Sequence, residues 1–219
     1  KMRICSSGNL INASTGGTVQ TATAGTSNVR AGVNAGNSIA SGGNYNVAIG
    51  DEAGTAITTG DNNTFVGYVS GDATTTANSN NAVGYAALTT NTTGANNVAV
   101  GQSALYANTT ADNNSAYGTS ALEANTTGTQ NTAVGANALD ANTEASANTA
   151  VGDNALGANS TGAGNTALGA SALFTVGTAS GNTGLGYFAG KSLNTGGSNT
   201  LIGYQAGQDT VALDDGSNN

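Results

Sequence analysis

Nonpolar and polar residues recur along this chain with a period of 17 residues. In each repeat an asparagine is followed by three mostly nonpolar residues and a glycine, as in the run Asn-Thr-Ala-Val-Gly from Asn131 to Gly135. A strict period in this range is typical of solenoid proteins, in which every repeat forms one coil of a continuous stack. The closing glycine occurs in ten copies with no insertion or deletion between them: Gly50, Gly67, Gly84, Gly101, Gly118, Gly135, Gly152, Gly169, Gly186 and Gly203.

Each run predicts a β-strand with two nonpolar faces. The residue before the glycine is large and mostly β-branched, as in Val134, so we expect it to face a core together with the residue two positions earlier. The intervening residue is mostly alanine, and with the glycine it makes the opposite face smooth. Ten stacked coils would form a rod about 50 Å long with a thin core. We therefore expect copies to associate along the smooth alanine and glycine face.

After the glycine come two variable residues and an Ala-Leu pair, as in Ala138-Leu139, and then a polar turn such as Asn125-Thr126-Thr127-Gly128. Each repeat reads as strand, bend, short strand and turn, which leaves no room for a useful helix. The chain is therefore expected to be all-β, a parallel β-solenoid or β-roll of 17-residue coils. In the outer repeats the leucine is replaced by Gly54, Gly71, Gly190 and Gly207.

An asparagine stands four positions before each closing glycine. Coils stacked in register would place these residues above one another at about 4.8 Å. We expect their side-chain amides to hydrogen-bond from coil to coil, as asparagine ladders do in cross-β assemblies. The predicted ladder consists of Asn46, Asn63, Asn80, Asn97, Asn114, Asn131, Asn148, Asn165, Asn182 and Asn199.

The register divides the chain into four parts. The first holds two predicted short strands, around Met2 to Cys5 and at Leu10-Ile11. The second is an imperfect copy whose Gly32 lies 18 residues before the next closing glycine, Gly50. An atypical end coil of this kind covers the first exposed strand of a solenoid. The parts are a lead-in (1–27), a degenerate capping coil (28–45), a ten-coil solenoid (46–207) and an extension or the start of a further repeat (208–219).

Composition narrows the functional classes. Only 7% of residues are charged and 5% aromatic, which alone would suggest disorder, but a disordered chain has no reason to keep this register. The net charge is −8 and Lys and Arg number only 4, so we expect no nucleic acid binding and no attraction to anionic membranes. No apolar run is long enough to span a bilayer. The single Cys5 allows no intrachain disulfide.

The sequence offers no catalytic constellation, so we expect no enzyme activity, no cofactor and no metal site. Histidine is absent, which excludes histidine-dependent triads and histidine metal ligation. Glycines follow the coil period and no phosphate-binding Gly-Lys-Ser/Thr loop occurs. The acidic pairs Asp51-Glu52 and Asp214-Asp215 are scattered along the chain, so we interpret them as solvated surface charge.

Four tyrosines directly follow closing glycines and are candidate surface contacts: Tyr68, Tyr85, Tyr187 and Tyr204. One interpretation is a strip that contacts a sugar or receptor. We favour the other, in which the rings cover a seam between protomers, because the same repeats carry glycine in place of leucine and need filling. The paired turn threonines also invite an ice-binding interpretation, which we disfavour because adjacent residues point to opposite sides.

The Asn-Thr-Ala-Val-Gly block and its Ala-Leu-x-Ala-Asn-Thr-Thr-Gly continuation resemble the repeats of phage tail fibres. They are also similar to the shorter Asn-Ser-Val-Ala-Ile-Gly repeat in the heads of trimeric autotransporter adhesins, which residues 46–50 match most closely. The run from Met2 to Asn9 resembles a segment that precedes such repeats in tail fibres, where an aspartate commonly occupies the place of Cys5. The resemblance covers roughly residues 1–12 and 46–207.

The resemblance implies a left-handed parallel β-roll assembled as a homotrimer in a virion appendage or at a cell surface. The function it implies is a non-enzymatic, structural segment of a tail fibre that rigidly displays, or contributes to, host attachment. Its partners would be its own copies and a host-surface glycan or receptor. Two alternatives stay open, a bacterial surface adhesin whose repeats bind the ligand themselves and a self-associating extracellular filament subunit.

Overall fold

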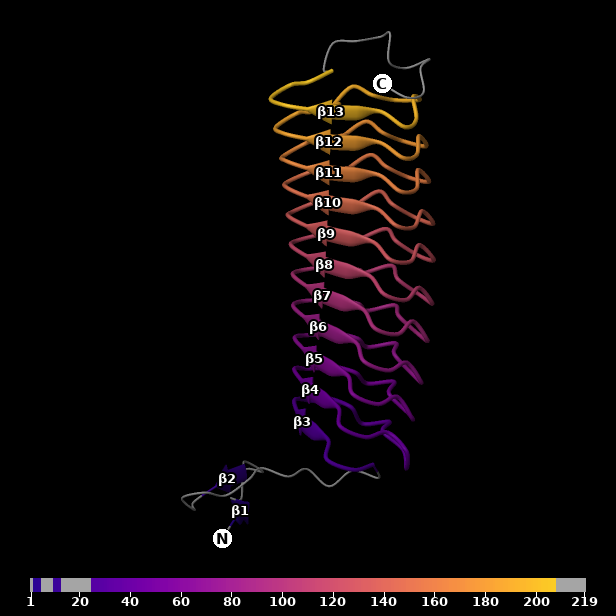
Figure 1. The fold of residues 1–219 in the computed structure, drawn as a ribbon. Coiled ribbons are helices and arrows are strands. Elements are labelled where there is room, and N and C mark those ends of the chain that lie inside the picture. Colours follow the sequence, from indigo (N-terminus) through magenta and orange to yellow (C-terminus); the bar gives the residue numbers. More distant parts are fainter. Residues whose placement is uncertain (1, 5–9, 13–24, 208–219) are drawn as a thin grey trace.

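The computed structural model describes residues 2–4, 10–12 and 25–207 (Figure 1). Residues 208–219, and with them the predicted C-terminal extension, lie outside the described part. The strands are β1 (Met2–Ile4), β2 (Leu10–Asn12), β3 (Val29–Ala31), β4 (Val47–Ile49), β5 (Thr64–Val66), β6 (Asn81–Val83), β7 (Val98–Val100), β8 (Ser115–Tyr117), β9 (Thr132–Val134), β10 (Thr149–Val151), β11 (Thr166–Leu168), β12 (Thr183–Leu185) and β13 (Thr200–Ile202). No helix forms in the described residues, which confirms the all-β prediction.

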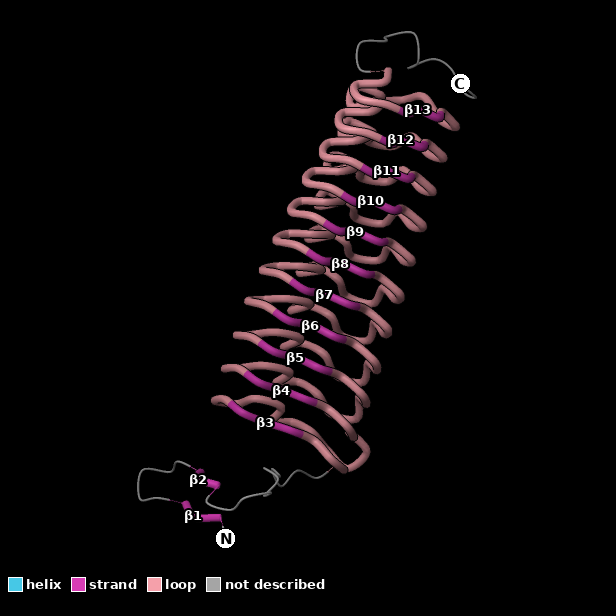
Figure 2. Tube along the Cα trace, turned by 60° about the vertical axis from the view of Figure 1, so that its left-hand side comes forward, coloured by secondary structure: helices cyan, strands magenta, loops and turns pink. Residues whose placement is uncertain are grey.

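Strands β3 to β13 form one parallel sheet of 11 strands in sequence order, stacked along one side of a rod (Figure 2). From β4 onward each residue pairs with the one 17 positions later, so that Thr132 lies beside Thr149 and Val134 beside Val151. The first step, from Val29 to Val47, takes 18 residues. The predicted parallel solenoid of 17-residue coils is thus confirmed. Separately, β1 and β2 pair antiparallel.

The inward face of the sheet is the alanine face, opposite to the prediction. Ala133 in the middle of β9 is fully buried, whereas Val134 beside it remains 38% exposed. The same order holds from β4 to β13, where the middle residue is buried in every strand. The narrow coil explains the inversion, since buried leucines from the opposite wall already fill the interior and leave room only for small side chains against them.

Those leucines belong to the Ala-Leu pairs, which form turns rather than the predicted short strand. Leu139 is fully buried with a φ of 53°, in the left-handed region that a branched side chain rarely enters. The backbone there still bonds between coils, because the Leu139 N–H donates to the carbonyl of Ala155 at 3.0 Å. Burial of the leucine offsets the strain, and the outer coils place Gly54 and Gly190 at the same position with φ of 54° and 62°.

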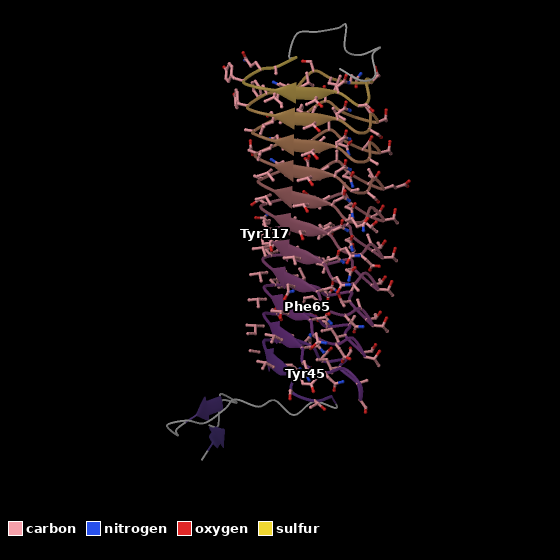
Figure 3. All side chains as sticks on the ribbon, in the orientation of Figure 1. Tyr45, Phe65 and Tyr117 are labelled. Carbon is pink, nitrogen blue, oxygen red and sulfur yellow. The ribbon has the colours of Figure 1, made fainter. Side chains whose placement is uncertain are left out.

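Volume is conserved where glycine replaces leucine. Phe65, labelled in Figure 3, occupies the middle of β5 in place of alanine. Its ring fills the space over Gly54 and Gly71. Near the other end Leu173 and Leu201 fill the space beside Gly190. Filling therefore comes from inside the coil, not from the exposed tyrosines that the sequence suggested for it.

The closing glycine is a backbone requirement. Gly135 has a φ of 135°, which L side chains rarely adopt, and a Cβ there would overlap the carbonyl oxygen of Gly152 in the next coil. Equivalent glycines repeat this close approach along the stack. The glycine therefore fixes both the bend after the strand and the spacing between coils.

Candidate functional site

The ten predicted ladder asparagines stack in one buried column inside the rod, and all ten have no exposed surface. Their main bond differs from the predicted amide-to-amide contact. From Asn46 to Asn182 each Oδ1 accepts the backbone N–H of the next asparagine, as when Asn148 donates to Asn131 at 3.0 Å, and Asn28 extends the series at its start. Direct bonds between side-chain amides link the column at four steps near its ends, such as Asn63 to Asn46 at 3.1 Å.

The Nδ2 groups of this first ladder hold the turns. Asn131 donates from Nδ2 to the carbonyl of Ala145 at 2.8 Å, and the same bond spans 14 residues in eight successive coils from Asn46 to Asn165. One asparagine thus satisfies the N–H of the residue directly before the next strand and a carbonyl of the turn that leads to it. This explains why no other residue type occupies the column, since both partners are buried.

A second asparagine ladder, which the sequence analysis treated only as part of a polar turn, runs through five central coils. Here side-chain amides do bond to one another: Asn142 donates from Nδ2 to Oδ1 of Asn125 at 2.9 Å and also to the carbonyl of Ala145 at 3.1 Å. All members are fully buried. The second ladder consists of Asn91, Asn108, Asn125, Asn142 and Asn159.

The second ladder ends where nonpolar residues take over its position. Val176 follows Asn159 in the next coil, and because valine has no side-chain donor the Oδ1 of Asn159 has no hydrogen-bond partner. At the other end Thr74 precedes Asn91, and its Oγ1 is likewise unpartnered. The neighbouring coil places buried Ile57 there. This position therefore tolerates nonpolar side chains, in contrast to the first ladder.

The turns alternate with a period of two coils, a feature not predicted from the 17-residue repeat. A Cβ on Gly128 would overlap the carbonyl of Ala145, and the same relation recurs for Gly60, Gly94 and Gly162. In the alanine-bearing coils a side chain one residue later accepts a backbone N–H from the coil before, as when Asp112 accepts from Ala95. Ser146 and Ser180 do the same. The alternating residues are Gly60, Ala77, Gly94, Ala111, Gly128, Ala145, Gly162, Ala179 and Gly196.

The paired threonines of the turns point to different sides, as the sequence suggested. Thr126 is partly buried and donates from Oγ1 to the carbonyl of Thr143 at 3.0 Å, while Thr127 is exposed. The exposed threonines of the turns therefore form a single row. A single row lacks the paired threonines of an ice-matching face, so the turns do not favour ice binding.

The four candidate tyrosines lie in two stacked and exposed groups. Tyr68 and Tyr85 have ring centroids 5.8 Å apart, and Tyr187 and Tyr204 have centroids 5.6 Å apart. Phe188 stacks on Tyr187 at 4.0 Å. Their exposed fractions run from 46% to 72%. Each stacked pair covers one face of each of its rings, which leaves less aromatic surface for a ligand and weakens the sugar-stacking interpretation.

The acidic side chains of the described residues do not cluster into a candidate metal site. Burial raises the pKa of Asp140, and nearby Glu123 raises it further, while backbone hydrogen bonds lower it. Burial likewise raises the pKa of Asp72, with a hydrogen bond from Thr55 acting against it. Across the described residues no three of the metal-ligating side chains gather into a group. Nor does that part of the chain contain a helix able to cross a membrane.

Comparisons of this chain with protein-family models, with curated proteins and with solved structures find no match. The fold is therefore defined by its own geometry, an in-register parallel β-solenoid.

Proposed function

We propose that this chain is a non-enzymatic structural segment of a trimeric fibre of the phage tail-fibre type. It holds a distal attachment region rigidly away from the particle, or contributes to attachment itself. The observation that carries the proposal is the unbroken stack from β3 to β13, in which every step keeps its register. A stack with two buried ladders resists bending because every coil is bonded to both neighbours.

The solenoid also has reason to assemble. Its interior is mostly alanine with one leucine per central coil, so a single rod buries little large apolar surface. Large apolar side chains remain exposed on the outside of the sheet, including Leu168 and Ile202. Assembly into a homotrimer covers such side chains and thickens the rod, which suits a virion appendage or another extracellular location.

A second candidate function, a surface adhesin whose repeats bind the ligand directly, is favoured by one observation. Tyr187, Phe188 and Tyr204 form an exposed aromatic group, and Lys191 lies 4.0 Å from the centre of the Phe188 ring. Aromatic and cationic groups together suit a host-surface glycan or receptor. Their mutual stacking is the reason we place this candidate second.

Mass photometry and binding to a glycan array test the proposal together. A discrete trimer with no glycan binding by this chain alone supports the passive fibre segment. Glycan binding that is lost in Tyr204→Ala supports the adhesin instead. Open-ended polymers support a filament subunit, and a monomer at micromolar concentration contradicts all three.

A further inference from the structure

The outward face of the sheet is a two-residue-wide strip without a charged side chain from β4 to β13. Two columns form it, because outward residues alternate with the buried middle residue of each three-residue strand. The first outer column is Val47, Thr64, Asn81, Val98, Ser115, Thr132, Thr149, Thr166, Thr183 and Thr200. The second outer column is Ile49, Val66, Val83, Val100, Tyr117, Val134, Val151, Leu168, Leu185 and Ile202.

The strip is large enough to be an interface. Its ten strands are separated by nine steps of about 4.8 Å, which makes it about 43 Å long. At roughly 10–15 Å width two facing copies would bury about 900–1,300 Å², which reaches the lower end of the range for specific interfaces. Seven of the ten side chains in the second outer column are exposed by 38% to 65%, and the other three, Val66, Val100 and Val151, are half-buried. A row of uncovered valines and leucines of this length is unusual on a soluble monomer.

The partner that fits this strip is a second copy of the chain. Only a partner with the same rise per coil keeps side chains opposed along the whole strip, and an identical rod has that rise. The net charge of −8 would repel copies that met through their charged sides, whereas the strip carries no charge. Contact through the strip is therefore the arrangement with the least repulsion and the most apolar burial.

A uniform strip would let two rods slip by whole coils, and β8 breaks that uniformity. Ser115 is the smallest residue of the first outer column, and Tyr117 is the largest of the second. Tyr117 is 45% exposed on the outside of the sheet (Figure 3). In contrast to Tyr68 and Tyr187, it stacks on no other ring of the described chain. A bulge and a gap thus occur side by side at one level.

We propose that copies pack in parallel through this strip with their coils level, and that Tyr117 of one copy seats over Ser115 of its neighbour. The inference rests on the proposed trimeric fibre, in which all chains run the same way. Rotation about an axis parallel to the rods brings residues of equal height together, so β8 meets β8. A slip of one coil would press Tyr117 against Val98 or Thr132, whose branched side chains leave less room.

Exchanging the volumes at β8 tests the pairing. Ser115→Phe fills the gap in the first outer column, and Tyr117→Val removes the bulge from the second outer column. The double variant, Ser115→Phe with Tyr117→Val, moves the large side chain from the second outer column to the first. We expect each single variant to weaken association about tenfold or more, and the double variant to recover most of it. Thr127→Phe, on the exposed turn, is the matched control and should assemble as the parent does. Sedimentation over a concentration series gives the association constants.

Four outcomes are distinguishable. Recovery in the double variant supports the pairing, and failure to recover overturns it. Single variants that assemble like Thr127→Phe overturn the strip as the interface while leaving the trimer intact. A monomeric parent chain overturns the proposed function as well.

A cross-link provides a test that does not depend on repacking. In a Cys5→Ser background, chains carrying Thr132→Cys assembled together with chains carrying Val134→Cys should form a disulfide between copies under oxidising conditions. Level packing with Tyr117 over Ser115 places the second outer column of one copy against the first outer column of its neighbour, so Val134 faces Thr132. Chains carrying Thr127→Cys should not cross-link. Equal cross-linking of the mixture and of Thr127→Cys contradicts the level arrangement.

Discussion

Replacing Asn131 by valine should destabilise the solenoid by about 3 kcal/mol. The Oδ1 of Asn131 is the partner of the buried Asn148 N–H at 3.0 Å, and an orphaned buried donor costs about 1–3 kcal/mol. The Nδ2 bond to the Ala145 carbonyl at 2.8 Å is lost as well, which adds about 0.5–1.5 kcal/mol. That carbonyl keeps its second donor, Asn142, so it is not left bare.

The matched variant is Asn159→Val in the second ladder. Oδ1 of Asn159 already lacks a partner, and the next coil carries Val176 at the same position. Asn159→Val removes the hydrogen bond that Nδ2 of Asn159 donates to Oδ1 of Asn142 at 3.1 Å. The unpartnered oxygen is then that of Asn142 instead of that of Asn159, so the number of unpartnered buried oxygens stays the same. Contact between two valines offsets the lost bond to the turn. We therefore expect a change within about 1 kcal/mol.

Urea denaturation followed by far-ultraviolet circular dichroism compares the two variants with the parent chain. The Asn131→Val midpoint should fall clearly, and the Asn159→Val midpoint should stay close to that of the parent. Equal losses in both variants would refute the reasoning, because they would mean that burial of any asparagine matters and the specific partners do not.

The remaining predictions concern packing, turn geometry and charge. Gly128→Ala should destabilise by about 2 kcal/mol or more because its Cβ would overlap the next coil's carbonyl, whereas Ala145→Gly should cost about 1 kcal/mol; thermal melting compares them. Phe65→Ala should cost about 3–5 kcal/mol by opening a cavity between two glycines, measured as a denaturation midpoint. Burial and Glu123 raise the pKa of Asp140 above 3.8, so the folded chain binds this proton more tightly than the unfolded chain. Stability should therefore fall as pH rises from about 4 through the raised pKa, and Asp140→Asn should flatten that fall in melting temperature.

The sequence was sufficient to predict the stack, because a fixed spacing of glycine and asparagine has a simple structural cause. The glycine position needs a φ near 135° and a close approach between backbones, as at Gly135. The asparagine position needs one acceptor and one donor inside the rod, as at Asn131. Requirements of this kind leave no freedom at the position, so the period is visible in the sequence.

The prediction of which face of the sheet points into the coil was wrong, because both faces are nonpolar. Size suggested that Val134 would lie inside, but Leu139 enters the same interior from the opposite wall and leaves room for Ala133 only. A signal was present at Phe65, which replaces an alanine where its own coil carries Gly71 and the coil before carries Gly54 in place of leucine. Such an exchange of volume between two columns indicates that they meet inside the coil.

The second ladder and the two-coil alternation were missed for different reasons. In the sequence Asn125 resembles an ordinary turn asparagine. In the structure it is buried directly after Leu122, whose left-handed conformation could not be predicted from the sequence. The alternation of Gly128 with Ala145 is visible in the sequence, but its cause is the orientation of one carbonyl in the next coil. Both features depend on how neighbouring coils fit together.

Distances between spin labels test the central claim, that equivalent residues lie directly above one another, most directly. In a Cys5→Ser background, labels at Thr59→Cys and Thr127→Cys lie four coils apart, and labels at Thr59→Cys and Thr178→Cys lie seven coils apart. At about 4.8 Å per coil the separations should be about 19 Å and 34 Å, before broadening by the label linkers. A separation that does not grow in proportion to the number of coils would contradict the stack and every proposal built on it.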